Sequence, residues 1–275
     1  MTALFGLLTA FTWASMNIPL QRNARRMDQR VMLFWVLLFG TGLVVVAALV
    51  VDGTVGPFGW RSLLVPALAG IAANVGFLCM TTGLRDGNIS VVIPIMALEG
   101  GIAVVFSVVL GERPGPIALA LIAAAVVGTL LVSYESGGEG RAAKGALWAI
   151  LAACAYAVML VALAHTDQPA ITSAAIMRVI ATLSAVPLLL MVRQPPTRAM
   201  MPSLLLCGGL DALAICLFAI AAAIGPSSIA SVSAAQFGTA AAVIAIVFLH
   251  ERLRTTQYIG VAVTMIAVSG LALIG

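Results

Sequence analysis

Pro94-Ile-Met-Ala-Leu-Glu99-Gly-Gly101 has a counterpart 137 positions further along the chain, Ser231-Val-Ser-Ala-Ala-Gln236-Phe-Gly238. The same offset pairs Asn74 with Asp211. Similar offsets pair three other features in the same order, namely Trp13 with Tyr156, Met16 with Met159, and Leu110-Gly-Glu-Arg113 with Leu249-His-Glu-Arg252. An ordered series of matches indicates an internal repeat. We therefore expect two halves that fold alike, residues 1–138 and residues 139–275.

The composition identifies the solvent that surrounds these halves. The chain has 275 residues, of which 62% are hydrophobic and only 9% are charged, and its mean hydropathy is +1.15. A soluble domain carries about 25% charged residues, so this chain cannot cover its surface with polar side chains, and the apolar excess must face lipid. The net charge of +4 does not indicate nucleic-acid binding, because basic residues of membrane proteins gather in loops on the cytoplasmic side.

Ten apolar runs of the length that crosses a bilayer are separated by charged residues, glycine or proline. Each half contains five runs, an odd number, so the second half should enter the membrane from the opposite side. The predicted fold is all-α integral membrane, with ten transmembrane helices in two five-helix inverted-topology repeats. The predicted spans are residues 3–20, 31–50, 62–83, 88–110, 116–133, 145–164, 172–192, 202–223, 227–249 and 256–274.

Three ionisable residues, Glu99, Asp211 and Arg178, lie inside the predicted spans. A charge at the centre of a spanning helix costs roughly 2.5–3.5 kcal/mol, so such residues usually face the protein interior and mark functional sites. We interpret Glu99 as a proton or cation site in a central cavity; the alternative is a protonated side chain hydrogen-bonded to a neighbouring helix. Gly100 and Gly101 follow it, which would allow another helix to approach closely.

Asp211 has two open interpretations, a binding site or a structural cap and helix contact. The repeat pairs Asp211 with Asn74, and Glu99 with Gln236, so each pair combines an acid with its amide counterpart. Such a cavity would be symmetric in shape and asymmetric in charge, which would help a transporter to orient a substrate. Arg178 is interpreted as reaching to the membrane interface. If it faced the cavity instead, it would favour substrates with a carboxylate.

Aromatic residues also fall at matching places in the two halves. Trp13 and Asn17 share one helical face, and Tyr156 repeats the position of Trp13. An aromatic ring at mid-span can stack on a substrate ring or bind a cation, although ordinary helix packing is the stronger interpretation. Phe218 follows Asp211 by seven residues, on the same helical face, and is a further candidate for the cavity wall.

The ten spans in two halves, the mid-span aromatics Trp13 and Tyr156, and the motifs Gly111-Glu-Arg113 and His250-Glu-Arg252 resemble the drug/metabolite transporter superfamily, in its ten-helix EamA branch. The resemblance covers essentially the whole chain. It implies a transporter of a small organic metabolite, amino-acid-like or amphipathic, that acts as an exporter. Glu99 or Asp211 would bind a proton on one side and release it on the other, so we expect secondary active, proton-coupled transport. The halves would rock around a cavity lined by spans one, three, four, six, eight and nine. We expect the protein to act as a monomer in the bilayer, without a cofactor or metal.

Two other functions stay open from the sequence. The first is an importer of an organic cation such as a quaternary ammonium compound, bound by Trp13 and Tyr156 through cation–π contacts. The second is an integral-membrane enzyme acting on lipid-linked substrates, or a lipid flippase. An enzyme would need an acid–base pair, a nucleophile or a metal site at the interface, and the short loops offer only charged pairs such as Glu112-Arg113.

The basic residues give an orientation in the inner (plasma) membrane. Eleven of the fourteen lie in loops after odd-numbered spans, and the side that holds both termini has only Arg61 and Arg113. By the positive-inside rule both termini lie outside the cytoplasm. The resemblance implies the opposite, because ten-helix members commonly have both termini inside, and we follow the charge distribution of this chain.

The orientation can be tested with reporters at the C-terminus. We expect an alkaline phosphatase fusion to be active and a green fluorescent protein fusion to be dark, because the basic loops should stay in the cytoplasm. A bright fluorescent fusion with an inactive phosphatase fusion would show that the termini are cytoplasmic.

Overall fold

The computed structural model describes residues 1–24, 26–53, 59–86, 92, 95–96, 98–133, 142–192, 196–237, 239–240, 243–244 and 255–274. Within these ranges all regular secondary structure is helical, which confirms the all-α prediction. The helices are α1 (Thr2–Ala24), α2 (Gln29–Val51), α3 (Trp60–Asp86), α5 (Glu99–Val109), α6 (Pro116–Ser133), α7 (Ala142–Ala164), α8 (Ala170–Leu190), the short 3-10 helix η1 (Arg198–Met200), α9 (Met201–Ile224), α10 (Ser227–Ala234) and α12 (Thr255–Ile274).

These helices fall where the hydropathy pattern predicts spans. Five are long and apolar enough to cross a membrane, in α2, α3, α7, α8 and the continuous segment Arg198–Ile224. Shorter apolar helices occur in α1, α5, α6 and α12. Large apolar side chains such as Val50, Leu190 and Leu273 point outward, as expected where lipid replaces water around the protein. Pro94 of the repeated segment and the motif at His250 lie outside the described residues.

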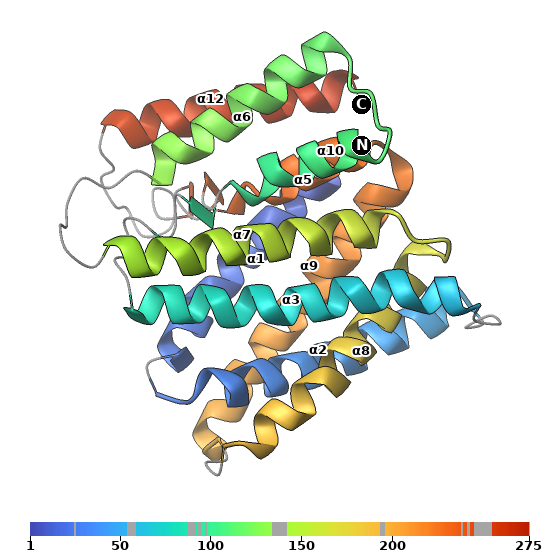
Figure 1. The fold of residues 1–275 in the computed structure, drawn as a ribbon, viewed down its shortest axis with the longest axis vertical. Helices are drawn as coiled ribbons and strands as arrows, with labels where there is room; N and C mark the ends of the chain where they lie inside the picture. Colours follow the sequence, from blue (N-terminus) through green and yellow to red (C-terminus); the bar gives the residue numbers. More distant parts are fainter. Residues whose placement is uncertain are drawn as a thin grey trace.

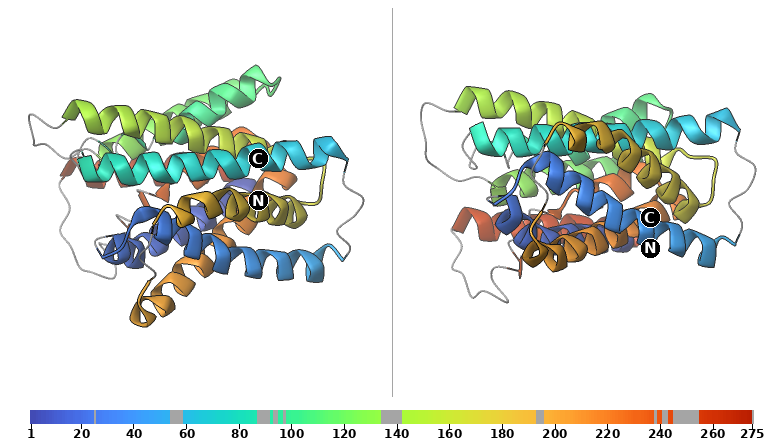
Figure 2. Two further views of the ribbon diagram at one scale, coloured as in Figure 1. Left: turned by 60° about the horizontal axis from the view of Figure 1, so that its bottom comes forward. Right: turned by 90° about the horizontal axis from the view of Figure 1, so that it is seen from below.

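The helices form a bundle in which elements distant in sequence pack side by side. In Figure 1, α6 and α12 pair at one end of the bundle and α2 and α8 at the other, with the remaining helices between them. Helix α1 packs against α9, α3 packs against α7, and α5 contacts α10. The two termini lie close together in both views of Figure 2. The most extensive contacts among the described helices each join a helix from the N-terminal part of the chain to one from the C-terminal part.

Glycines at the contacts let the helix backbones approach closely. A side-chain carbon at Gly100 would lie 2.6 Å from Cβ of Ala235, directly after α10. This confirms the expected close approach beside Glu99. Gly40 of α2 and Gly208 of α9 face each other, and a Cβ atom on Gly40 would lie 2.8 Å from the Gly208 carbonyl oxygen. Contacts of this kind are typical of membrane helices, which associate through small residues.

Two helices of the C-terminal part begin at residues that are capped by carboxylates of the N-terminal part. Asp52, after α2, accepts hydrogen bonds from the backbone N–H (2.8 Å) and the hydroxyl (2.7 Å) of Thr172 in α8. Glu112, after α5, accepts hydrogen bonds from the Ser227 hydroxyl (2.9 Å) and from the Ser228 N–H (3.0 Å) and hydroxyl (2.9 Å) of α10. Carboxylates satisfy the free N–H groups at helix N-termini and interact favourably with the helix dipole. The glutamate of the Gly-Glu-Arg motif thus caps a helix.

Gly40 and Gly42, both in α2, provide a matched test of the close packing. We expect Gly40→Ala to lower the free energy of unfolding by about 1–3 kcal/mol, because its methyl group would collide with α9. Gly42→Ala should be neutral or stabilising, because no atom lies within 4 Å of the added carbon and alanine favours the helix. Chemical unfolding of the purified proteins in detergent measures both. Equal effects of the two substitutions would contradict the proposed contact.

Candidate functional site

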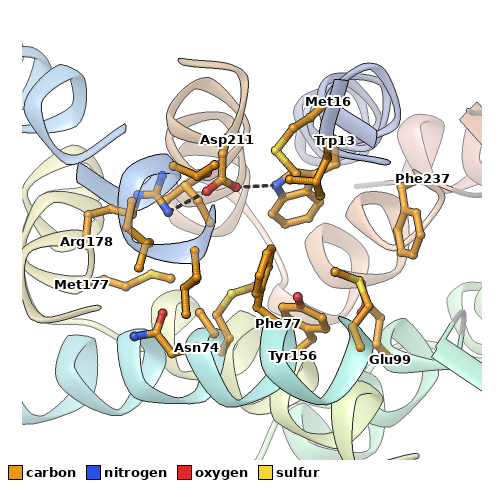
Figure 3. Close-up of a pocket in the computed structure, with 18 of the residues that line it drawn as sticks. Trp13, Met16, Asn74, Phe77, Glu99, Tyr156, Met177, Arg178, Asp211 and Phe237 are labelled. Atoms are coloured by element: carbon orange, nitrogen blue, oxygen red, sulfur yellow. Dashed lines mark hydrogen bonds and ion pairs between the residues drawn. The ribbon is translucent and has the colours of Figure 1, made fainter. Parts of the chain in front are cut away.

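A cavity of about 110 Å³ opens near the middle of the bundle. Figure 3 shows that its walls come from both parts of the chain. Its lining includes the predicted helices α1, α3, α5, α7 and α9, and also α2 and α8, which the sequence analysis left out. The lining residues are Trp13, Met16, Leu20, Leu33, Val36, Leu37, Ala73, Asn74, Phe77, Met80, Met96, Glu99, Tyr156, Met159, Met177, Arg178, Asp211, Ile215 and Phe237.

One wall of the cavity holds an ion pair between Arg178 of α8 and Asp211 of α9. The Arg178 Nη1 atom lies 2.7 Å from the Asp211 Oδ2 atom. The other carboxylate oxygen, Oδ1, accepts a hydrogen bond of 3.1 Å from the indole N–H of Trp13 in α1. The Arg178 side chain is only 3% exposed and that of Asp211 is 17% exposed. Asp211 therefore joins three helices, and its charge is already compensated.

The expected position of Arg178 at the membrane interface is wrong. Its side chain points into the bundle because Asp211 provides a compensating charge there, and an unpaired interior carboxylate would be far more costly. The chain makes room for the guanidinium at Gly40, where a larger residue would collide with the Nη2 atom. Nη2 and Nε of Arg178 have no hydrogen-bond partner among the described residues.

Glu99, the first residue of α5, carries a second carboxyl group at the cavity. Its side chain is 4% exposed. In contrast to Asp211, it has no ion pair and no side-chain hydrogen bond with any of the described residues. Figure 3 places it at the end of the cavity opposite Arg178, near Phe237 and Tyr156. The cavity thus contains one compensated and one uncompensated carboxyl group.

Asn74 of α3 lies at the cavity, as the repeat pairing with Asp211 suggested. Its amide nitrogen donates two hydrogen bonds to α8, to the carbonyl oxygen of Ala181 (2.8 Å) and to the hydroxyl of Ser184 (2.9 Å). Its carbonyl oxygen is buried and has no hydrogen-bond partner in the described part of the chain. Asn74 thus connects α3 to α8 and leaves one acceptor available.

The rest of the wall is apolar and rich in sulfur and aromatic rings. The aromatic candidates Trp13 and Tyr156 both line the cavity. Sequence reasoning missed Phe77, Phe237 and most of the methionines: Met80, Met96 and Met177 also line it. Methionine adapts its shape to irregular partners. A signal was available for Phe77, which follows Asn74 by three residues on the same side of α3, and for Met80, which follows Phe77 by three.

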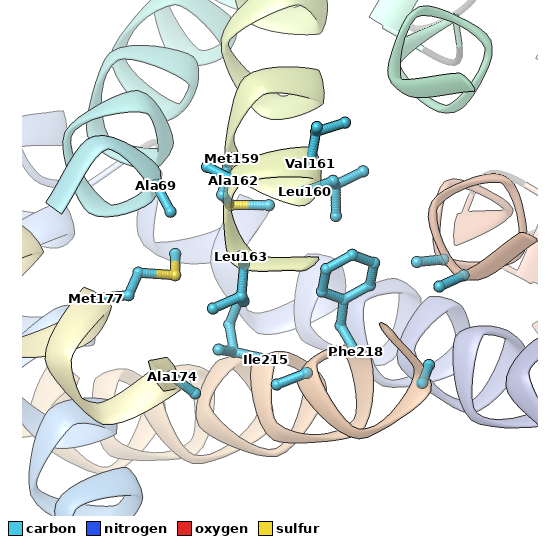
Figure 4. Close-up of a cluster of buried hydrophobic side chains, with 14 of the residues drawn as sticks. Ala69, Met159, Leu160, Val161, Ala162, Leu163, Ala174, Met177, Ile215 and Phe218 are labelled. Carbon is cyan, nitrogen blue, oxygen red and sulfur yellow. The ribbon is translucent and has the colours of Figure 1, made fainter. Parts of the chain in front are cut away.

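Three other candidates are placed differently. Phe218 is fully buried in the hydrophobic cluster of Figure 4, with Leu160 and Ile215, and does not line the cavity. It shares a helical face with Asp211 but lies about 10 Å further along the axis. Gln236 accepts a hydrogen bond from the hydroxyl of Thr129 in α6, outside the cavity lining. The backbone of Asn17 belongs to α1, and its side chain lies outside the described part of the structure.

Comparison with known proteins identifies the family. The sequence pattern of the EamA-like transporter family matches residues 1–134 and 143–273. The chain belongs to the EamA-like transporter family. A crystal structure with 18% sequence identity superposes with a TM-score of 0.83 and covers 100% of this chain and 99% of the other. That likeness supports the fold of this EamA-like protein. No curated protein sequence matches the chain.

Membership in this family confirms the resemblance and supports a function as a membrane transporter of small molecules. Two separate family matches, one in each part of the chain, agree with the internal repeat. Among the described residues no group of three or more His, Cys, Asp or Glu side chains could hold a metal ion. Three polar features of the described cavity lining are the ion pair of Arg178 with Asp211, the carboxyl group of Glu99 and the side-chain oxygen of Asn74.

The ion pair can be tested by removing one or both partners. We expect Arg178→Ala to lower the free energy of unfolding by about 3 kcal/mol, because Asp211 would remain buried without its counter-charge. The double variant Arg178→Met, Asp211→Asn should recover most of this loss, since it removes both charges and keeps an acceptor for Trp13. Thermal and chemical unfolding in detergent measure the effect. A double variant no more stable than Arg178→Ala would contradict it.

Proposed function

We propose that this EamA-like protein is a secondary active, proton-coupled transporter of a small amphipathic organic metabolite. The observation that carries the proposal is the carboxyl group of Glu99, which lies beside a largely apolar cavity and has no ion pair with any of the described residues. Ionisable groups inside membrane proteins commonly form proton and substrate pathways. A small cavity with apolar and aromatic walls and few polar groups suits an amphipathic solute.

Glu99 is the proton carrier in this proposal, and Asp211 is not. The sequence offered both carboxyl groups for this role. Asp211 is held by Arg178 and Trp13, and protonating it would remove the ion pair and leave the buried guanidinium without its counter-charge. Glu99 has no such partners among the described residues, and it can bind a proton or a cationic group of the substrate without disrupting the bundle. The proton and the substrate then compete for the carboxyl group of Glu99, because binding of either lowers the affinity for the other.

The arrangement of helices supports movement of the two halves, residues 1–138 and 139–275, as inverted repeats. Helix α1 packs on α9, and its counterpart α7 packs on α3, which is the counterpart of α9. The two contacts therefore correspond to each other under the repeat. In Figure 1 the colours show α3 running from right to left and its counterpart α9 running from lower left to upper right. Repeats that run oppositely can exchange conformations and so open the cavity to alternate sides.

Direction and location complete the proposal. We infer export from the cell, from a multi-pass position in the inner membrane, by a protein that acts as a monomer. The eleven basic residues on the side opposite the termini support termini outside the cytoplasm. Import of an organic cation is the second candidate function, favoured by Glu99 and by the rings of Trp13 and Tyr156 in the same cavity.

The role of Glu99 predicts the behaviour of an isosteric variant. In proteoliposomes that contain the pH indicator pyranine, we expect phenylalanine or phenethylamine to drive proton movement through the native protein. Glu99→Gln should reduce this proton movement at least tenfold, because the amide keeps its size and hydrogen-bonding capacity but binds no proton at neutral pH.

The matched control is Glu112→Gln, which changes the same group at the helix cap outside the cavity. This variant should retain solute-driven proton movement. Native proton movement in Glu99→Gln would reject Glu99 as the carrier, and loss in both variants would show that the change acts through folding.

A further inference from the structure

The amide group of Asn74 has only one orientation that satisfies its neighbours. Both hydrogens of its nitrogen are used, one by the Ala181 carbonyl oxygen at 2.8 Å and one by the Ser184 hydroxyl at 2.9 Å. Reversing the amide would place its oxygen against the Ala181 carbonyl oxygen, and two acceptors cannot pair. The oxygen of Asn74 therefore points away from α8, and Figure 3 shows it directed toward the cavity.

This oxygen is a buried acceptor without a partner. The Asn74 side chain is 6% exposed, and its Oδ1 atom has no hydrogen bond with any described residue. Most buried polar groups in native proteins are paired, so an orphaned acceptor needs an explanation. Because Asn74 lines the cavity, a hydrogen-bond donor on the transported molecule would provide the missing partner.

The charges of the cavity indicate what carries that donor. Arg178 and Asp211 neutralise each other at 2.7 Å. The remaining charged side chain of the described lining is Glu99, so the cavity has a net negative charge when Glu99 is ionised. Arg178 keeps two nitrogens without a hydrogen-bond partner, Nε and Nη2, but Asp211 already balances its charge, so a substrate carboxylate would add a second uncompensated negative charge beside Glu99. A positively charged donor, an ammonium group, suits both Glu99 and Asn74.

Building on the proton-coupled transport proposed above, we propose that the cavity selects primary and secondary ammonium ions with an apolar body over quaternary ammonium ions, and that Asn74 makes this selection. An ammonium group with N–H bonds donates to the Asn74 oxygen. A quaternary ammonium group has the same charge and no N–H bond, so it leaves that oxygen buried and unpaired. Sites built around a polar group discriminate strongly against analogues that leave it unpaired.

The apolar and aromatic lining supplies the other part of the specificity. Tyr156, Phe77 and Phe237 border the same space, and methionines fill the remaining wall. These groups would bind the hydrocarbon part of an arylalkylamine and attract its charge through the ring faces. They act equally on quaternary ions, so charge and aromatic contacts alone cannot separate the two classes of amine. The discrimination has to come from Asn74.

The test compares three probes of equal charge and similar shape: phenethylamine, N-methylphenethylamine and N,N,N-trimethylphenethylammonium. Their affinities for the purified full-length protein are measured in nanodiscs by isothermal titration calorimetry at neutral pH. We expect the two amines to bind about tenfold to a hundredfold more tightly than the quaternary ion, the range for a hydrogen bond from a charged group. Equal affinities, or tighter binding of the quaternary ion, would overturn the proposal.

Variants assign the preference to one residue. Asn74→Leu removes the acceptor at similar volume and should bring the three affinities within about threefold of one another, mainly by weakening the amines. If this variant does not fold, Asn74→Ala makes the same test. The matched control is Asn23→Leu, since Asn23 is also a buried asparagine but pairs with Ser203 outside the cavity lining. It should retain the preference of the native protein. An unchanged preference in the Asn74 variants would overturn the assignment.

The two proposals fail in different ways. Equal binding of all three probes, together with proton movement that depends on Glu99, would reject the role of Asn74 and leave proton-coupled transport intact. Absence of binding by every probe would overturn the proposed selection of ammonium ions that carry only an apolar body. Proton movement driven by phenylalanine would then still test the transport function. Loss of proton coupling with a preserved preference for amines would reject only the role of Glu99.

Discussion

The ion pair between Arg178 and Asp211 is the constraint on which the cavity depends. A charge inside a membrane protein must be compensated by the protein itself. At 2.7 Å, with Trp13 bound to the second carboxylate oxygen, the pair fixes α8, α9 and α1 relative to one another. It also requires glycine at position 40, where α2 and the guanidinium occupy adjacent space. One electrostatic requirement thereby determines the composition of a helix contact and the position of three cavity walls.

The same pair determines which polar groups are available for function. Because Asp211 is compensated, the free carboxyl group of the described cavity belongs to Glu99, and the free acceptor to Asn74. The two halves contribute polar groups of different kinds at corresponding positions. Here one half supplies the groups that can meet a ligand, and the other supplies a structural ion pair.

Hydropathy predicted the helical fold and most helix boundaries because the length of an apolar run follows from the thickness of the bilayer. The cost of intramembrane charge correctly directed attention to Glu99 and Asp211. The position of Arg178 could not be predicted, since a chain position near a helix end does not reveal the partner on another helix. The prediction that Phe218 lines the cavity was wrong for a related reason. A shared helical face gives the direction of a side chain around the helix axis, but it does not show whether that side chain lies level with the cavity along the axis. Gln236 faces α6 because α10 ends at Ala234, just before it.

The carboxylates of Asp52 and Glu112 bear on the assembly of the protein. They cap α8 and α10, helices that follow them by more than a hundred residues in the chain. Because synthesis proceeds from the N-terminus, both carboxylates have been made before the helices that they cap. The later helices then complete their first turns only by docking on the earlier ones. The N-terminal half acts in this sense as a template, and the C-terminal half made alone would lack two of its helix caps.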